Sequence, residues 1–210
     1  MTAVWGPLGW MTLHSVATLY PENPTPQEQS LLTLWLDSFR DTITCPSCRD
    51  HFTSLLAKYR QLVPNLMSSR QAFTVFTFRA HNAVNRRLQK PIYTSVEACM
   101  AALKIPLQLR SAGEYRRAYL AHITRHWRTY RDITGISALR KITELNRIEA
   151  DYCAPRDTNF AVTIAPDVVV LPNDALESVP QDSSIRIAPN ARYAPAGGIR
   201  LTGGGLRIRR

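Results

Sequence analysis

The stretch Cys45-Pro46-Ser47-Cys48-Arg49-Asp50-His51-Phe52 carries more structural and chemical information than any other part of this 210-residue chain. Proline suits the first turn of a helix, so the stretch predicts a helix that begins at the cysteines. Unpaired backbone N–H groups and the macrodipole at a helix start favour thiolate over thiol. A two-residue gap lets Cys45 and Cys48 close a disulfide across one turn, which predicts a redox-active pair.

Two other interpretations of the cysteine pair remain open at this point. Cys45, Cys48 and His51 are zinc-ligand types, but a closed tetrahedral site needs a fourth ligand, and no second pair with zinc-finger spacing follows. A thioredoxin-like site needs strands around the motif, whereas both flanks here have helical periodicity. His51 lies one turn after Cys48, so it belongs either to the core or to the same pocket as the dithiol.

A second informative stretch, His81-Asn82-Ala83-Val84-Asn85, follows about thirty residues later. Helical spacing places His81, Val84 and Asn85 on one face. Burying a histidine and two asparagines without hydrogen-bond partners is costly. A planar ligand with many donors and acceptors would supply those partners, and Arg86 and Lys90 would neutralise its phosphates.

Apolar residues recur at helical spacing over the first two thirds of the chain, which predicts an all-α fold. Four helices and a short fifth make a bundle, and two helices are added to it. The expected helices cover residues 4–19, the segment after Pro26 through Phe39, Cys45 through Tyr59, Ser68 or Ser69 to Lys90, 95–103, 112–133 and 135–150. The domain division we expect is a bundle over 1–106, an additional helical segment over 107–153, and an extended or disordered tail rich in Pro, Gly and Arg over 154–210.

The chain is basic, with a formal net charge of +10. The excess is spread along the chain rather than gathered in one run, so we expect no nucleic-acid partner. No apolar segment approaches the length of a membrane span, so none is expected. The N-terminus lacks the basic start and apolar core of a secretory signal, which predicts a cytoplasmic location.

Four motifs occur in one order over about residues 3–95. They are Trp5-Gly6-Pro7 followed by Trp10 and Leu13-His14, then Tyr20-Pro21, then Cys-x-x-Cys-x-x-His-Phe, then His-Asn-x-Val-Asn-x-x-Leu-x-Lys-Pro. In this series the chain resembles the Erv/ALR family of FAD-linked sulfhydryl oxidases. The resemblance implies a helical bundle that binds FAD and forms a homodimer.

The resemblance also implies a role for each matching residue. Cys45 would exchange with thiols of client proteins, and Cys48 would lie against the flavin, which passes electrons to oxygen and yields peroxide. The flavin site would be lined by Trp10, His14, Tyr20 and His51. The adenine and phosphate portion would be held by His81, Asn82, Val84, Asn85 and Lys90, with Tyr93 close by.

The chain departs from the family pattern at several positions. A structural disulfide common in the family would need cysteines where Phe78 and Ser95 stand, and Pro7 replaces a common arginine. The chain has no second Cys-x-x-Cys that could pass electrons from client thiols to the Cys45–Cys48 pair. Cys99 and Cys153 are therefore free thiols, a substitute structural disulfide or a relay pair.

Family members in large DNA viruses form disulfides in virion proteins, and the resemblance points to such a member in the host cytoplasm or the virion. The alternative function is a virion structural or assembly protein that keeps the bundle as a scaffold. Its tail, residues 154–210, would dock to a capsid or assembly partner, because short apolar runs such as 168–171 can add a strand to another sheet.

Overall fold

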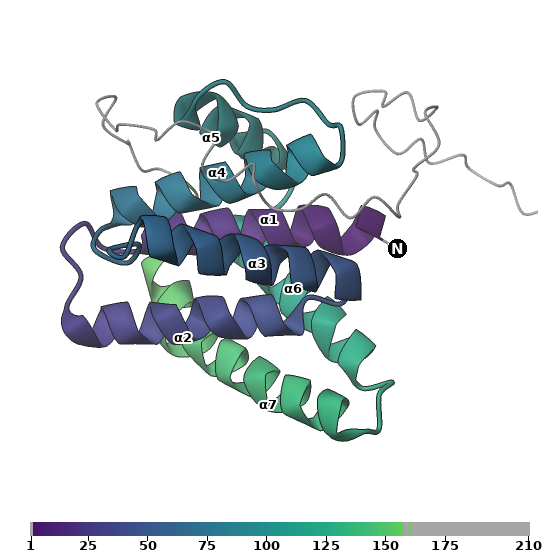
Figure 1. The fold of residues 1–210 in the computed structure, drawn as a ribbon. Coiled ribbons are helices and arrows are strands. Elements are labelled where there is room, and N and C mark those ends of the chain that lie inside the picture. The colour runs from purple at the N-terminus through teal and green to yellow at the C-terminus, as the bar shows by residue number, and fades with distance from the viewer. Residues whose placement is uncertain (1, 158–159, 161–210) are drawn as a thin grey trace, which may run out of the picture. The chain divides into compact units, whose positions relative to one another are not determined.

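The computed structural model describes residues 2–157 and residue 160, and within this part of the chain it contains seven α-helices and no strand (Figure 1). The expected all-α fold class is confirmed. The helices are α1 (Thr2–Leu19), α2 (Pro26–Thr42), α3 (Pro46–Leu62), α4 (Arg70–Arg87), α5 (Val96–Lys104), α6 (Ala112–Trp127) and α7 (Ile133–Ile148). Three short turns of helix follow α5 or α7: η1 (Pro106–Gln108), η2 (Glu149–Cys153) and η3 (Ala154–Arg156).

Helices α1 to α4 alternate in direction, and local sequence determines where they begin (Figure 1). Pro26 and Pro46 occupy the first turns of α2 and α3, where the missing N–H costs no hydrogen bond. Thr25 and Glu28 form a capping box at α2, and the Ser69 hydroxyl accepts the Ala72 N–H at α4. Because the helices alternate, the first residues of α3 and the last residues of α4 lie at the same end of the bundle.

Helix α4 ends earlier than its apolar pattern predicts, at Arg87. Gln89 adopts a φ of 54°. The Lys90 N–H donates to the Asn85 carbonyl over 2.8 Å, and the Gln89 N–H donates to the Arg86 carbonyl over 3.0 Å. These are the two bonds of a Schellman motif, so the chain reverses before Pro91 is reached.

The boundary between α6 and α7 also differs from the expected one. Helix α6 ends at Trp127 rather than residue 133, and α7 begins at Ile133 because the Asp132 carboxylate accepts the Gly135 N–H over 2.9 Å. A Cβ at Gly135 would lie 2.3 Å from the Tyr130 carbonyl oxygen, so this close turn requires glycine. The apolar pattern runs through this turn and does not reveal it.

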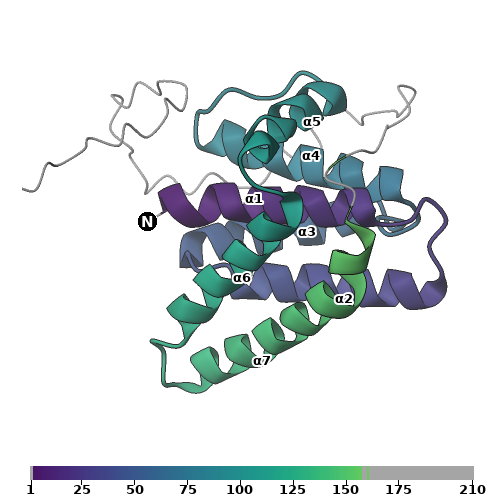
Figure 2. The ribbon, with the colours of Figure 1, turned by 180° about the vertical axis from the view of Figure 1, so that it is seen from behind.

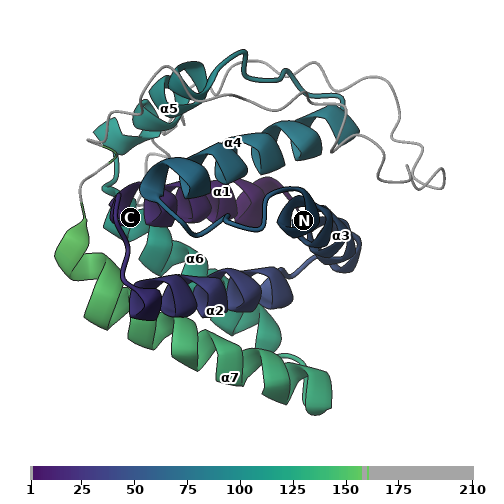
Figure 3. The same ribbon diagram turned by 60° about the vertical axis from the view of Figure 1, so that its left-hand side comes forward.

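The two added helices share the core of the bundle. Helix α6 packs along α1 (Figure 2), and α7 packs along α2 (Figure 3). Tyr119 of α6 stacks on Phe39 of α2 with ring centroids 5.2 Å apart. The Trp127 indole donates to the Thr42 carbonyl over 2.9 Å. The segment that follows residue 106 therefore covers apolar faces of α1 and α2.

A chain that stops at residue 106 is expected to self-associate and to lose cooperative unfolding. Its α1 and α2 would expose the apolar face that α6 and α7 bury, and large exposed apolar patches drive association. Size-exclusion chromatography with light scattering and urea unfolding test this, with a chain ending at residue 160 as the control. A monomeric 1–106 chain that unfolds cooperatively would instead support an autonomous bundle with a boundary at residue 106.

One buried cation joins three parts of the fold. Arg116 of α6 is 1% exposed, and its guanidinium donates to Glu149 Oε2 at 2.7 Å, Asp157 Oδ2 at 3.0 Å and Ser15 Oγ at 2.5 Å. These contacts connect α6 to α1 and to the chain beyond α7. In the described part of the chain, no helix has the length and apolar character of a membrane span.

Candidate active site

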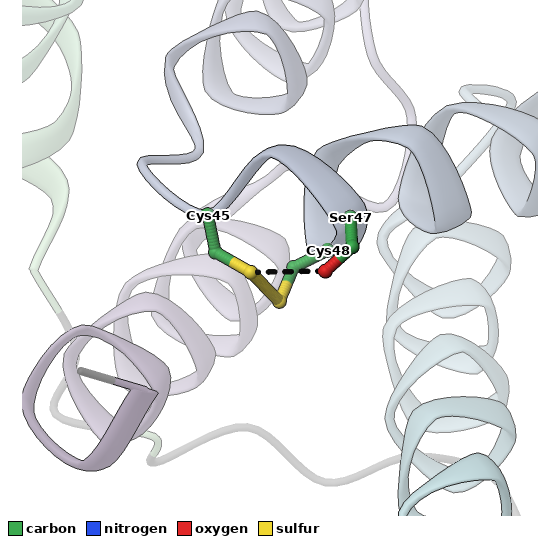
Figure 4. The surroundings of a disulfide bond; sticks show 3 residues. All are labelled: Cys45, Ser47 and Cys48. Carbon is green, nitrogen blue, oxygen red and sulfur yellow. Dashed lines mark hydrogen bonds between the residues drawn. A yellow bond between two sulfur atoms is a disulfide. The ribbon is translucent and has the colours of Figure 1, made fainter. Parts of the chain in front are cut away.

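Cys45 and Cys48 form a disulfide at the start of α3, with Cα atoms 5.2 Å apart (Figure 4). Cys45 is the N-cap residue, and Pro46 begins the helix. Cys45 Sγ lies 3.5 Å from Ser47 Oγ, and Cys48 packs against the hydrophobic core. The disulfide uses both sulfurs that a zinc site would need. In the described residues no strand flanks the motif, so the thioredoxin-like interpretation is wrong.

An added helix contacts Arg49, the residue that follows Cys48. The Arg49 guanidinium lies over the Trp127 ring, 5.7 Å from its centroid. The same indole donates to the Thr42 carbonyl in the segment that leads into Cys45. Trp127 thus supports the cysteine motif from α6, a role that sequence reasoning missed because the two residues are far apart in the chain.

An aromatic cluster lies between α1, α4 and the connection that follows α4. Trp10 and His81 stack face to face, with ring centroids 4.1 Å apart and an interplanar angle of 9°. The Tyr93 ring meets His81 edge-on at 5.2 Å. Three of the residues expected at a flavin site are therefore brought together, although Trp10 and His81 leave no room for another ring between them.

His14 continues this cluster into the core. Its Nε2 lies 3.1 Å from His81 Nδ1, and its Nδ1 lies 3.0 Å from Thr77 Oγ1. Burial, and then the proximity of His81, lowers the pKa of His14 well below its ordinary value. Burial and the charge of Lys90 lower the pKa of His81 to about 3. Both imidazoles are therefore neutral at neutral pH.

The asparagines of the second motif bind the chain itself. The Asn82 side chain exchanges two 2.9 Å hydrogen bonds with the Tyr93 backbone, and Asn85 Nδ2 donates to the Pro91 carbonyl over 3.1 Å. Burial of these amides therefore does not by itself require a ligand, and their contact with a cofactor stays a prediction from the resemblance. Both asparagines hold the 88–95 connection against α4 by these hydrogen bonds. Val84, which lies between them in the sequence, is half-buried.

Cations lie near two of the histidines, His51 of α3 and His81 of α4. Burial and the charge of Arg87 lower the pKa of His51 to about 4. Lys90 has the same effect on His81, as a secondary cause after burial. Positive charges thus lie close to both histidines, and an anionic ligand would be stabilised there.

Tyr20 is not brought to the aromatic cluster. It is fully buried at the end of α1, about 15 Å along the helix from Trp10 at 1.5 Å per residue. Its hydroxyl donates to the Met67 carbonyl over 2.9 Å, and its ring meets Phe73 edge-on. A cofactor contact by Tyr20 stays a prediction from the resemblance.

Cys99 and Cys153 are both free and buried, so the substitute structural disulfide does not form. Cys99 Sγ lies within 4.8 Å of the ligating nitrogens of His14 and His81. Burial raises the pKa of each thiol to about 12, which keeps both protonated at neutral pH. Phe78 and Ser95 stand where many family members have the cysteines of a structural disulfide. Here Phe78 packs in the core, and Ser95 caps α5.

The histidine pair predicts a pH dependence of stability. Both histidines have folded pKa values below 6.5, so under acid conditions the unfolded chain binds protons that the folded chain does not. Their contribution is fully present above pH 6.5 and is lost as the pH falls below it, by up to about 1.4 kcal/mol per pH unit for each histidine. Urea unfolding between pH 7 and pH 5 measures the slope. His81→Asn should flatten it, and an unchanged slope in this variant would contradict the assignment.

Comparison with known proteins places residues 8–102 in the Erv1/Alr family model. A candidate FAD-linked sulfhydryl oxidase of Invertebrate iridescent virus 6 is 35% identical over 92 residues, which is 42% of this chain and 83% of the relative. The FAD-linked sulfhydryl oxidase of African swine fever virus is 35% identical over 88 residues, 42% of this chain and 71% of the relative. The FAD-linked sulfhydryl oxidase ERV2 of Saccharomyces cerevisiae is 33% identical over 88 residues, 42% of this chain and 43% of the relative. No solved structure gave a significant match.

Proposed function

The chain belongs to the Erv1/Alr family, and on that premise we propose that it is an FAD-linked sulfhydryl oxidase that forms disulfides in client proteins. The observation that carries this proposal is the Cys45–Cys48 disulfide at the start of α3, in a bundle that also brings Trp10, His14 and His81 together. The function requires thiol substrates and oxygen as acceptor.

The aromatic cluster and the cations near its histidines fit the chemistry of FAD. The cluster offers aromatic faces and a hydrogen-bonding imidazole for the ring and sugar portions, and the neighbouring cations Lys90 and Arg87 suit two phosphates. When bound, FAD supplies the redox chemistry that links a dithiol to oxygen. The residues we propose to hold it are Trp10, His14, His51, His81, Asn82, Val84, Asn85, Lys90 and Tyr93.

The cysteine pair performs thiol–disulfide exchange. A client thiolate attacks Cys45 Sγ, the Cys45–Cys48 bond breaks, and Cys48 leaves as a thiolate. A second client thiolate then attacks the client sulfur of the mixed disulfide and releases Cys45. The client loses two electrons, and the pair gains them. The α3 N-terminus stabilises the leaving Cys48 thiolate, which lowers the barrier to exchange.

The visible spectrum of the purified protein and its oxygen uptake with dithiothreitol test this function. A yellow protein with flavin bands and dithiol-dependent oxygen uptake supports it. A protein that stays colourless after incubation with FAD and takes up no oxygen would refute it.

Three finer aspects of the function are proposals too, of which the first two rest on the resemblance and the third on the composition of residues 154–210. We propose a homodimer, and any dimer must use a surface other than the faces of α1 and α2 that α6 and α7 cover. We also propose action in the host cytoplasm or the virion, and docking to a capsid or assembly partner through residues 154–210, most of which lie outside the described part. If the assembly role is the main one, deleting residues 161–210 should abolish partner association and leave flavin binding intact.

A further inference from the structure

A chain of hydrogen bonds runs from α4 through α1 and back to α4, and the position of each proton follows from its first member. The Thr77 hydroxyl has one proton, and the shorter of its two contacts, 2.8 Å to the Thr74 carbonyl, is the one in which Thr77 can only be the donor. Thr77 Oγ1 therefore acts as an acceptor toward His14 Nδ1, 3.0 Å away. With the Thr77 proton directed to Thr74, His14 carries its own proton on Nδ1.

The remaining protons are then determined. A neutral imidazole carries one N–H, so His14 Nε2 has a lone pair and accepts from His81 Nδ1 over 3.1 Å. His81 is also neutral, and with its proton on Nδ1 its Nε2 is a hydrogen-bond acceptor only. Thr77 thus determines the proton position on a histidine that it does not touch.

The orientation of His81 is fixed as well. Trp10 covers one face of the ring, Tyr93 meets it edge-on, and His14 holds Nδ1. No hydrogen bond to His81 Nε2 is found within the described residues, and this atom is not among their buried atoms that lack a partner. Part of this atom is therefore accessible to a ligand, although His81 as a whole is only 7% exposed.

We propose that Thr77, acting through His14, sets His81 Nε2 as an acceptor that recognises a hydroxyl or N–H donor of the bound cofactor and not its phosphates. The inference rests on the proposed function, because it takes FAD as the ligand. Sugar and ribityl hydroxyls and ring N–H groups are donors, whereas phosphate oxygens at neutral pH only accept. Cations such as Lys90 would bind the phosphates. The resemblance assigns His81 to the adenine and phosphate portion of FAD, and the proposal restricts it to the hydroxyl and N–H donors. Thr77 is a positioning residue in this account.

Nitrogen NMR of the imidazoles in the full-length FAD-bound protein tests the proton positions directly. We expect both His14 and His81 to be protonated at Nδ1 and unprotonated at Nε2. A His81 protonated at Nε2 would overturn the inference. The spectrum of the protein before FAD is added should show the same proton positions. A protein that binds no FAD would refute the proposed function and with it the recognition of FAD by His81, while this spectrum alone would still decide the proton positions set by Thr77.

Substitution of Thr77 tests the consequence for the cofactor. Thr77→Val removes the acceptor and keeps the shape, so His14 should shift its proton to Nε2 and force His81 to present an N–H at the site. The dissociation constant for FAD, measured by recovery of flavin fluorescence on dilution, should rise about tenfold to a hundredfold. Thr77→Ser keeps the hydroxyl and should behave as wild type. Equal affinity and equal NMR spectra in the valine and serine variants would overturn the inference, and if the valine variant does not fold, the wild-type spectrum still decides the proton positions.

Discussion

Replacing Cys48 by serine is expected to reduce oxygen uptake with dithiothreitol to the rate of FAD in protein-free buffer. The Cys45–Cys48 bond is the only disulfide in the described part of the chain, and Cys99 and Cys153 are buried and protonated. No other pair there can accept two electrons from a client. Bound flavin should remain, because the serine removes neither the aromatic cluster nor the neighbouring cations. An oxygen electrode and a visible spectrum of the same sample measure both properties.

The matched control for this variant is Cys153→Ala, which removes a thiol that exchange does not use. It should keep wild-type turnover per bound flavin. A Cys153→Ala protein that loses turnover while keeping its flavin would show that this cysteine serves in a relay. A Cys48→Ser protein with wild-type turnover would contradict the assignment of the redox pair.

Arg116→Met is expected to lower the free energy of unfolding by about 3–5 kcal/mol, because removal of one partner of a buried ion pair leaves the other charge uncompensated. Glu149 is 7% exposed, and its Oε1 already lacks a hydrogen-bond partner within the described residues. Without the guanidinium, Oε2 would lose its partner too. Urea unfolding measures the difference.

Arg117→Met is the control for the ion pair, because it removes a neighbouring arginine that is exposed. It should change stability by no more than about 0.5 kcal/mol. Glu149→Gln in the Arg116→Met background removes the unpaired charge and should recover part of the loss. Equal stability of the Arg116→Met and Arg117→Met proteins would show that the buried pair contributes no net stability.

The helices were predictable where local chemistry determines them. Pro26, Pro46, Ser69 and Ser95 mark four starts that sequence alone locates, because capping involves residues within one turn. The end of α4 at Arg87 was not predictable from apolar periodicity, since a backbone reversal at Gln89 terminates it. The burial of Arg116 was not predictable either, because its partners lie 33, 41 and 101 residues away.

In the candidate site, too, features set by local motifs were predictable and features set by distant contacts were not. The cysteine pair and the grouping of Trp10, His14, His81 and Tyr93 agree with the motifs. The hydrogen bonds between Asn82 and the Tyr93 backbone were not predictable, because no helical pattern shows that the connection after α4 lies beside that helix. The position of Thr77 near the histidines was predictable, because Thr77 lies one turn before His81 on the same face of α4.

Anaerobic titration of the FAD-bound protein with dithiothreitol tests the central claim most directly, namely that electrons from thiols enter through Cys45–Cys48 and reach the cofactor. The visible band of oxidised flavin should bleach in the wild-type protein and persist in Cys48→Ser on the same timescale. Equal bleaching in the two proteins would contradict the claim, because it would show that the flavin is reduced without the disulfide.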